Sequence, residues 1–442
     1  MGFYNTENWP EKSRYYRWPW SNNDNPVGWL EITDLCNLHC KGCYRKAMEG
    51  HRDIETLKSE VDFFIRVRNI DTVCIAGGEP LIYPRIVELV KYIADRGVKP
   101  NIITNTQALT KELLKELYKA GLFGLTCHFD MLQERPGLNK NDKKITELDL
   151  MPLRQKVADL VYEVGKGKIY TTFNTTVYHE NFKYIPDIVK WARKNPHKVQ
   201  GLDFITYRGI PIKEGVIFDV EEAGEVTRED LKKDLGYVED ASQIDITSVD
   251  VYNLLKDHFG DKYEPCAYLG GTGHIMDYKW WGQALLMEKN GKVYGSIGPR
   301  TMEFLQIIHH WFKRRYFMYL RKSTVSRFLI LFTALIGDRQ LKSTRRRLLL
   351  TLLNPVKWFQ PLYSQSIGIN QPPDMMENGM ASMCESCPDA CVWEGNLVSS
   401  CRLDEYRKYG RLMNAIVYNK DTDKRGVEIE GTTKEEIGAE TK

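Results

Sequence analysis

The stretch TDLCNLHCKGCYR, residues 33–45, decides the fold, because it holds Cys36, Cys40 and Cys43 within eight residues. Three thiols are one fewer than a closed structural zinc site uses, and an odd number cannot all pair as disulfides. His39 or His51 would complete a zinc site, and the spacing alone leaves that alternative open. The stretch therefore predicts a metal site whose last ligand must come from outside the three cysteines.

Around this loop, short β-rich runs alternate with helix-like segments from about residue 28 to residue 209. The expected strands are residues 28–33, 72–76, 99–104, 124–130, 169–177 and 202–207. Amphipathic stretches between them, such as 84–97 and 110–121, end at a glycine, as helices commonly do. Six such units predict an α/β fold, with a parallel sheet curled into a partial (βα)6 TIM-like barrel. Active sites of such barrels lie at the C-terminal ends of the strands.

The second expected strand is followed directly by AGGEP, residues 76–80. Glycines allow a ligand to approach the backbone, and Glu79 offers a carboxylate that could receive an ammonium group. Because this motif and the cysteine loop both follow strands, we expect them on the same face of the barrel. The alternative is a plain turn between strand and helix.

These two motifs, in this order, resemble those of the radical S-adenosylmethionine (radical SAM) enzymes, and the resemblance covers about residues 28–210. It implies that Cys36, Cys40 and Cys43 hold three irons of a [4Fe–4S] cluster, for which thiolates are the usual ligands. The fourth iron is left for the amino and carboxylate groups of S-adenosylmethionine. The resemblance also implies that an electron donor such as ferredoxin or flavodoxin reduces the cluster. S-adenosylmethionine is then split, and the resulting 5′-deoxyadenosyl radical removes a hydrogen atom from the substrate.

Polar residues at the strand ends supply further candidates, because in the family such side chains touch the ribose, the carboxylate or the substrate. Thr106 and Tyr207 occupy such positions, and no catalytic residue is assigned. Each candidate has a turn or capping role as its alternative. The predicted cofactor-binding residues are Gly77, Gly78, Glu79, Pro80, Asn105, Asp130, Asn174 and Arg208. Cys74 and Cys127 lie inside apolar strands and are expected to be buried hydrophobic residues.

A second cysteine group, Cys384, Cys387, Cys391 and Cys401, has the spacing C-x2-C-x3-C-x9-C. Four thiols suit a structural zinc site. The resemblance instead favours an auxiliary [4Fe–4S] cluster of the SPASM or a related type. Cys266 is the remaining thiol outside the barrel and could replace one of the four. Five cysteines outside the barrel are too few for two complete all-cysteine clusters.

The segment between residues 304 and 360 carries twelve Lys and Arg residues against one acid, Asp338, in a chain whose net charge is +3. Such asymmetry points to an anionic partner surface. Within residues 303–322, one helical face is expected to hold Leu305, Ile308, Phe312, Tyr316 and Tyr319, with Gln306, His310, Lys313 and Arg314 largely opposite. The apolar run that follows is shorter than the ~18 residues needed to span a bilayer. A helix lying in a membrane interface is predicted, with a core helix bearing a basic face as the alternative. Nucleic acid is not expected, because long aliphatic runs suit lipid better.

Four stretches resemble, more loosely, the archaeal tetraether-lipid synthase group of the radical SAM family. They are HFDMLQERPG, FNTTVYHENFKYIPDIVKWA, FITYRGIP and IGPRTMEFLQIIHHWFKRRYF. This resemblance implies hydrogen abstraction from an unactivated C–H bond of a lipid or other long apolar substrate, with carbon–carbon bond formation as one outcome. The group carries more metal-binding cysteines than this chain. A radical SAM methyltransferase, a peptide-modifying maturase and a non-catalytic zinc-binding protein are the alternatives.

The chain is expected to divide into six regions. They are an N-terminal arm (1–25), the radical SAM core barrel (26–211), a substrate-side insertion (212–300), a basic amphipathic helical segment (301–365), an auxiliary iron–sulfur region (366–418) and a disordered tail (419–442). The C-terminal extension of the barrel is expected to be mainly helical. Because the first residues include no apolar stretch of the secretory type, we expect a cytoplasmic protein, peripheral at the inner membrane face.

Overall fold

The computed structural model describes residues 9–45, 50–138, 145–207, 216–220, 224–226, 245–273, 278–319, 324–325, 338, 341–358, 360–375, 381–412, 414–419 and 424–425. The six predicted strands all form, and they pair side by side in chain order as a parallel sheet. They are β2 (Val27–Glu31), β3 (Thr72–Ala76), β4 (Lys99–Thr104), β5 (Gly124–His128), β6 (Tyr170–Val177) and β7 (Gly201–Thr206). This arrangement confirms the predicted barrel-like α/β core.

The sheet continues beyond β7 with strands from the C-terminal half of the chain. β14 (Leu362–Asn370) pairs in parallel with β7, and β11 (Tyr278–Met287) pairs antiparallel with β14. β10 (Ala267–Gly270) and β1 (Tyr16–Arg17) complete that edge of the sheet, and β12 (Val293–Ser296) and β13 (Thr324–Val325) pair beside β11 and β14. The extension is therefore mixed α/β rather than mainly helical as predicted.

Helices that follow the core strands cover the outer face of the sheet. They are α1 (Ile54–Phe63), α2 (Ile86–Asp95), α3 (Lys111–Lys119), α4 (Met151–Gly165), α5 (His179–Phe182) and α6 (Ile185–Lys194). Side-chain caps fix several of the helix starts, since Asp53 accepts from the backbone of Thr56 and Thr110 from that of Leu113. The amphipathic α3 buries Leu114 and Leu117 against the sheet. The apolar core thus lies between these helices and the outer face.

The remaining elements belong mostly to the C-terminal half. The helices are α8 (Ser248–Phe259), α9 (Pro299–Lys313), α11 (Leu341–Leu352) and α12 (Leu403–Tyr409). Single turns are η1 (Lys12–Arg14), η2 (Phe64–Arg68), η3 (Pro80–Ile82), η6 (Gly260–Lys262), η7 (Pro355–Lys357) and η8 (Ser400–Arg402). Short strands are β8 (Val216–Val220), β9 (Gly224–Val226), β15 (Asp374–Met375), β16 (Ala381–Ser382), β17 (Ala390–Trp393), β18 (Asn396–Ser399), β19 (Asn414–Asn419) and β20 (Lys424–Arg425). The tail predicted to be disordered lies mostly outside the described residues.

The inner face of the sheet is polar and partly open. Along β7 and β14 every second residue is partly exposed, and this set includes Asp203, Ser366, Gly368 and Asn370. Their neighbours Leu202, Phe204, Ile367 and Ile369 are buried. Because side chains alternate between the two faces of a strand, one face packs on helices and the other lines the interior of the barrel.

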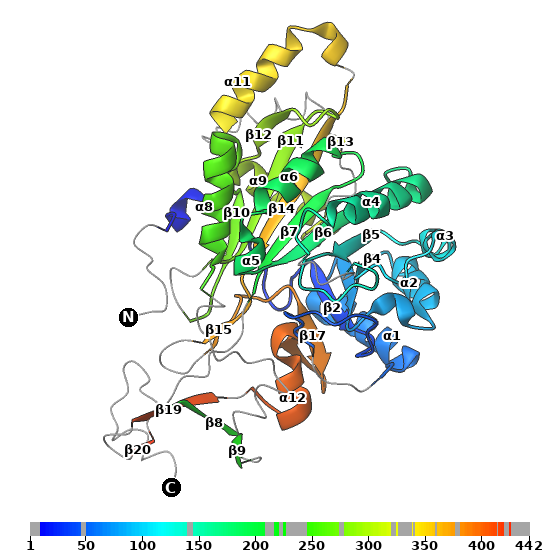
Figure 1. Ribbon diagram of the computed structural model, residues 1–442, viewed down its shortest axis with the longest axis vertical. Helices are drawn as coiled ribbons and strands as arrows, with labels where there is room; N and C mark the ends of the chain where they lie inside the picture. The colour runs from blue at the N-terminus through cyan, green and yellow to red at the C-terminus, as the bar shows by residue number, and fades with distance from the viewer. Residues whose placement is uncertain are drawn as a thin grey trace.

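The second cysteine segment, residues 381–402, lies between the two edges of this curled sheet. On the β10 side, the backbone N–H of Glu385 donates to the carbonyl of Gly270 at 3.0 Å. Cys384 and Gly271 also pair through their backbones as an isolated antiparallel β-bridge. On the β2 side, Asn25 donates to the carbonyl of Ser386 at 2.9 Å, and β17 packs on β2. Figure 1 shows β17 and α12 (orange) beside β2.

The predicted amphipathic face of α9 is wrong in detail. The helix ends at Lys313, so Tyr316 and Tyr319 lie beyond it. Gln306 is buried because its side chain donates to the carbonyl of Phe317 at 2.8 Å, whereas Phe312 is 75% exposed. Farther along, α11 projects from one end of the molecule (Figure 1). In the part of the chain that the structure describes, no helix is long and apolar enough to cross a membrane.

Candidate functional site

The loop 33–45 and the AGGEP turn form one unit at the C-terminal ends of β2 and β3. The backbone of Gly78 donates to Thr33 at 2.6 Å, and that of Glu79 donates to Leu35 at 2.8 Å. A Cβ atom on Gly78 would overlap the carbonyl of Leu35, and one on Gly77, whose φ is +129°, would overlap that of Thr33. The glycines therefore let the cysteine loop pack directly on the turn. The predicted approach of a ligand to their backbone stays a prediction.

In the described part of the chain, none of the three thiols of this loop forms a disulfide; Cys36 is exposed, and Cys40 and Cys43 are partly buried. The thiol of Cys43 donates to the carbonyl of Arg45 at 3.3 Å. Burial, followed by the nearby charges of Asp130 and Cys43, raises the pKa of Cys40 to about 12. A cationic cluster would favour the thiolates. Among the described residues, no three His, Cys, Asp or Glu side chains converge on a site for a single ion. A [4Fe–4S] cluster does not require such convergence, because each thiolate binds a different iron, so three thiols fit a cluster with one open iron.

His51, one possible fourth ligand of the zinc alternative, is already engaged. Its Nδ1 lies 2.9 Å from the hydroxyl of Thr33, and its ring packs edge-on against Tyr83. His39 is exposed on the loop, where its carbonyl accepts from the backbone of Glu134 at 2.9 Å. Among the described residues, neither histidine joins the three thiols in a group that could hold a single metal ion.

Glu79 is fully buried, and both of its carboxylate oxygens are occupied. One accepts from the hydroxyl of Thr104 at 2.7 Å and the backbone of Leu81 at 2.9 Å, and the other accepts from the backbone of Asn105 at 2.7 Å. Burial raises the pKa of this carboxyl group, while these hydrogen bonds oppose the rise. Glu79 thus ties the turn after β3 to the end of β4. Pro80 follows it as the first residue of η3.

Asn105, predicted from the end of β4, reaches the cysteine loop. Its amide nitrogen lies 2.7 Å from Oδ1 of Asn37 and 3.7 Å from Sγ of Cys36. Its own Oδ1 accepts from the backbone of Gln107 at 2.8 Å. Because the backbone of Asn105 is held by Glu79, the AGGEP turn positions a side chain that contacts a thiol.

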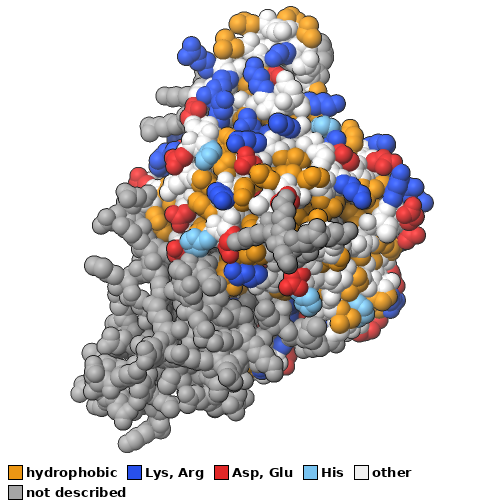
Figure 2. Space-filling view, in the orientation of Figure 1, with side chains coloured by type: hydrophobic (Ala, Val, Ile, Leu, Met, Phe, Trp, Pro, Cys, Tyr) orange, Lys and Arg blue, Asp and Glu red, His pale blue; other side chains and the backbone are white. Residues whose placement is uncertain are grey.

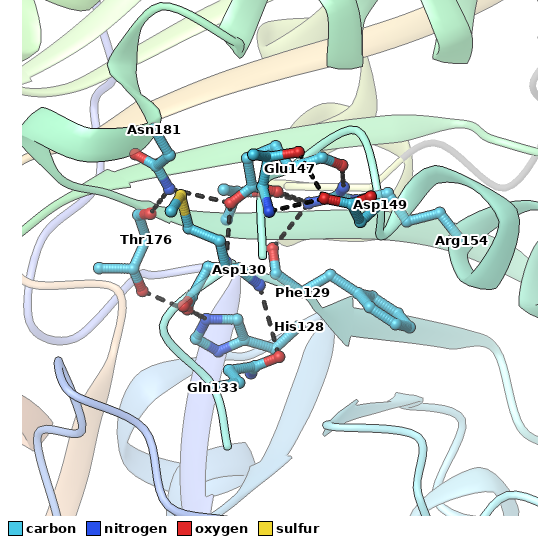
Figure 3. A network of polar contacts seen from close by, with 12 residues as sticks. His128, Phe129, Asp130, Gln133, Glu147, Asp149, Arg154, Thr176 and Asn181 are labelled. Atoms are coloured by element: carbon cyan, nitrogen blue, oxygen red, sulfur yellow. Dashed lines mark hydrogen bonds and ion pairs between the residues drawn. The ribbon is translucent and has the colours of Figure 1, made fainter. Parts of the chain in front are cut away.

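The end of β5 carries a polar network centred on the predicted Asp130 (Figure 3). Its Oδ2 lies 2.9 Å from Nε2 of His128, and the hydroxyl of Thr176 lies 3.2 Å from the same nitrogen. Behind it, the buried ion pair of Glu147 with Arg154, at 2.5 Å, holds the turn through bonds to the backbone of residues 129 and 131. Asp130 therefore positions His128, a residue that our sequence analysis did not select.

Gln133 and Arg135 were also missed. Oε1 of Gln133 accepts from Nε of Arg135 at 2.9 Å, and Arg135 donates to the carbonyls of Asn105 and His128 at 2.9 and 2.7 Å. Burial lowers the pKa of Arg135 to about 10, and the nearby charge of Cys40 opposes the shift. Nη1 of Arg135 is buried without a hydrogen-bond partner in the described part of the chain. The side chain of Gln133 interacts with the thiol of Cys40 and opposes the rise of its pKa. A guanidinium donor beside Cys40 suits an anionic group.

Asn174 lies on β6, in register with His128 of β5 and Asp203 of β7. It is buried, and its Oδ1 has no hydrogen-bond partner in the described structure. Tyr207, at the end of β7, packs its ring 5.0 Å from that of Tyr178 beside the cysteine loop. Arg208 lies outside the described residues, and its predicted role stays a prediction.

The second cysteine segment holds its thiols close together. A hydrogen bond between Cys384 and Cys387 raises the pKa of Cys384 and lowers that of Cys387 to about 7. Sγ of Cys387 lies 3.6 Å from the hydroxyl of Ser399, and burial raises the pKa of Cys401 to about 12. Cys391 is buried in β17. Four soft donors in one segment suit an iron–sulfur cluster, in which each thiolate binds a different iron. Among the described residues, no three of them converge on a site for a single ion such as zinc.

Cys266 occupies a different environment. It is fully buried in an apolar cluster with Trp18, Trp20 and Trp280, and its thiol donates to the carbonyl of Gly282 at 3.2 Å. This placement favours a structural thiol rather than the predicted metal ligand. Cys74 and Cys127 are buried, as predicted.

Comparisons with known proteins point to the same region. Residues 30–192 match the family model described as the Radical SAM superfamily. The tungsten-containing aldehyde ferredoxin oxidoreductase cofactor-modifying protein of Pyrococcus furiosus is 28% identical over 170 residues, which cover 37% of this chain and 47% of that protein. The PqqA peptide cyclase of Bradyrhizobium diazoefficiens is 30% identical over 166 residues, 37% of this chain and 42% of that protein. The matches thus span less than half of these relatives.

Among solved structures, Streptococcus suis SuiB bound to precursor peptide SuiA is 20% identical with a TM-score of 0.34. That match covers 42% of this chain and 40% of SuiB.

Proposed function

We propose that this chain, whose residues 30–192 are a radical SAM domain, removes a hydrogen atom from an unactivated C–H bond of a lipid or other long apolar substrate. Carbon–carbon bond formation is one outcome. When bound, the [4Fe–4S] cluster and S-adenosylmethionine supply the 5′-deoxyadenosyl radical that takes the hydrogen atom, after one electron arrives from a donor such as ferredoxin or flavodoxin.

In this proposal, Cys36, Cys40 and Cys43 hold the cluster. Asn105, fixed by Glu79, orients the loop through its contact with Cys36. The unused Nη1 donor of Arg135 binds the carboxylate of the cofactor, because a buried guanidinium gains most from an anionic partner. Asp130 holds His128 at the substrate side. Cys384, Cys387, Cys391 and Cys401 hold an auxiliary cluster.

The observation that carries the lipid assignment is the exposure of large apolar side chains on α9 and around α11 and η7, a set that we call the apolar patch. Of the eleven exposed large hydrophobic residues in the part of the chain that the structure describes, eight belong to it: Ile307, Trp311, Phe312, Leu349, Leu350, Leu353, Val356 and Trp358. They lie on α9, α11 and η7 or directly beside these elements, where Lys313, Arg314 and Arg346 are also exposed. In Figure 2, hydrophobic side chains (orange) lie at the end of the molecule from which α11 projects, and Lys and Arg side chains (blue) lie beside them. Apolar groups flanked by cations suit a membrane surface with anionic lipids.

The substrate class is tested by hydrogen transfer. The reconstituted enzyme is incubated anaerobically with S-adenosylmethionine, dithionite and vesicles of lipid with perdeuterated hydrocarbon chains. We expect deuterium in 5′-deoxyadenosine, measured by mass spectrometry, and none with C40A. Formation of 5′-deoxyadenosine without deuterium would exclude these chains as the substrate. Mass spectrometry of lipid that purifies with the protein would identify the natural compound.

The membrane contact is tested separately by vesicle sedimentation. The double variant W311S/F312S should bind anionic vesicles at least about tenfold more weakly, since burying one large apolar side chain contributes about 1.5–3 kcal/mol. L148S is the matched control, because Leu148 is 49% exposed outside the apolar patch. Equal binding of the two variants would contradict a peripheral membrane role for the patch.

A peptide-modifying maturase is the second candidate, since one relative is a PqqA peptide cyclase. Deuterium transfer from a labelled peptide, and not from lipid, would favour it. Methyl transfer, the remaining radical SAM alternative, would instead appear as a substrate heavier by one methyl group.

A further inference from the structure

A cavity of about 120 Å³ lies inside the barrel, against the inner face of β5, β6, β7, β11 and β14. We call it the inner chamber. Much of its wall is aromatic, with Trp18, Trp20, Tyr170, Trp280, Phe317 and Tyr319 among its lining residues. The rings of Trp18 and Trp20 stack, with 4.8 Å between their centroids. Among the described residues that line it, Asp203 is the only charged one.

The inner chamber lies beneath the cysteine loop. Thr126 lines it from β5, and His128, two residues later on the same face, belongs to the network at the strand end. Thr172 and Asn174 have the same relation on β6. Two residues along a strand span about 7 Å, so a ligand in the chamber can reach the residues at the mouth.

Asp203 has an unused hydrogen-bond acceptor. Its Oδ2 accepts from the amide of Asn370 at 3.0 Å, but its Oδ1 is buried without a partner in the described structure. Gly368 leaves room for this oxygen, since a Cβ there would overlap it. Oγ1 of Thr172, also in the wall, is likewise unpartnered, and the Nε1 donor of Trp20 is the third such atom.

No cation in the described wall compensates this carboxyl group. Burial raises the pKa of Asp203 to about 7, which shows the cost of its charge in this environment. The described wall of the inner chamber therefore holds one carboxyl group and no positive charge.

We propose that the inner chamber binds a protonated nitrogen group, such as a primary ammonium, on an apolar body. Asp203 and Thr172 accept its hydrogen bonds. Aromatic faces attract cations and also cover the apolar part. This site goes beyond the proposed function, because ligand binding here requires neither cleavage of S-adenosylmethionine nor a lipid.

The experiment compares n-butylammonium with 1-butanol, which is similar in shape but neutral, by anaerobic calorimetry on the reconstituted holoenzyme. We expect the cation to bind at least tenfold more tightly than the alcohol. D203N should abolish this preference, because it removes the charge and keeps the shape. D257N, at an exposed position on α8, should retain the preference.

G368A provides a second variant, because its methyl group would occupy the space beside Oδ1 of Asp203. G368A should weaken the binding of n-butylammonium and change the affinity for 1-butanol little. Equal affinities of cation and alcohol in the unmodified protein, or a preference that survives in D203N and G368A, would overturn the proposal. Formation of 5′-deoxyadenosine is measured in the same samples, so failure of the chamber is distinct from failure of the radical chemistry.

Discussion

The two cysteine segments are held by the fold in different ways. The loop 33–45 continues one strand and packs on the turn after the next, through the backbone bonds of Gly78 and Glu79. The segment 381–402 instead contacts both edges of the sheet, at Gly270 on one side and at Asn25 on the other. The first loop therefore stays at the mouth of the barrel with an exposed Cys36. The second joins edges that are distant in the sequence, so metal bound there is linked to closure of the barrel.

The largest expected difference separates C40A from C387A. C40A removes one of three thiols at the mouth, and formation of 5′-deoxyadenosine should fall to the background of a sample without enzyme. C387A should retain much of this cleavage but block product formation. Liquid chromatography with mass spectrometry measures both compounds. If C387A also abolished cleavage, the two segments would not have separate roles.

The packing of the cysteine loop, residues 33–45, on the AGGEP turn is tested by substitution of Gly78. G78A places a methyl group against the carbonyl of Leu35, so the loop must move and cleavage should fall by at least about tenfold, since a misplacement of 1 Å can cost about 100-fold. G97A is the control, because Gly97 has φ +72° but open space around its Cβ position. Circular dichroism checks that both variants keep the sheet. Equal activity in the two variants would show that the close packing is unimportant.

The closure by the second segment is tested at Arg68. This buried side chain donates to the carbonyls of Val27, at 2.8 Å, and of Cys387 and Pro388. R68M leaves these acceptors without a donor, at about 1–3 kcal/mol for each buried group. The iron content should fall from about eight to about four per chain, with 5′-deoxyadenosine still formed. R68K should recover part of the iron. Loss of cleavage together with the iron would mean that the mouth depends on this closure.

The smallest effect is expected at Glu79, which we regard as a positioning residue. E79Q keeps the shape of the side chain but replaces one carboxylate oxygen by an NH2 group. That group faces a hydrogen-bond donor, which is the backbone N–H of Asn105 or Leu81 or the hydroxyl of Thr104. Affinity for S-adenosylmethionine, measured by calorimetry, should weaken about tenfold, the equivalent of about 1.4 kcal/mol, with unchanged iron content. E88Q, on the exposed side of α2, is the control. Unchanged affinity in E79Q would remove Glu79 from the site.

The sequence alone was sufficient to predict those elements that depend on local patterns of residues. The six core strands and the two motifs after β2 and β3 follow from periodicity and spacing. The addition of β14 to β7 could not be predicted in this way, because pairing between Gly201–Thr206 and Leu362–Asn370 depends on tertiary packing. Gln306 was assigned to the polar face of α9 but is buried, because it meets the carbonyl of Phe317 beyond the helix.

Single polar residues of the candidate site also could not be selected from the sequence. His128, Gln133 and Arg135 lie in a stretch noted only for its resemblance to a family, and each is defined by contacts across strand ends. Cys266 could not be separated from the other thiols by spacing, since only its buried contact with Gly282 distinguishes it. Asp203 likewise gains its role from the chamber around it.

The most direct test of the central assignment is the metal content and cofactor cleavage of the unmodified chain after anaerobic reconstitution. We expect about eight irons per chain, as for two four-iron clusters, and formation of 5′-deoxyadenosine on addition of dithionite and S-adenosylmethionine. Zinc in place of iron, with no cleavage, would contradict the assignment.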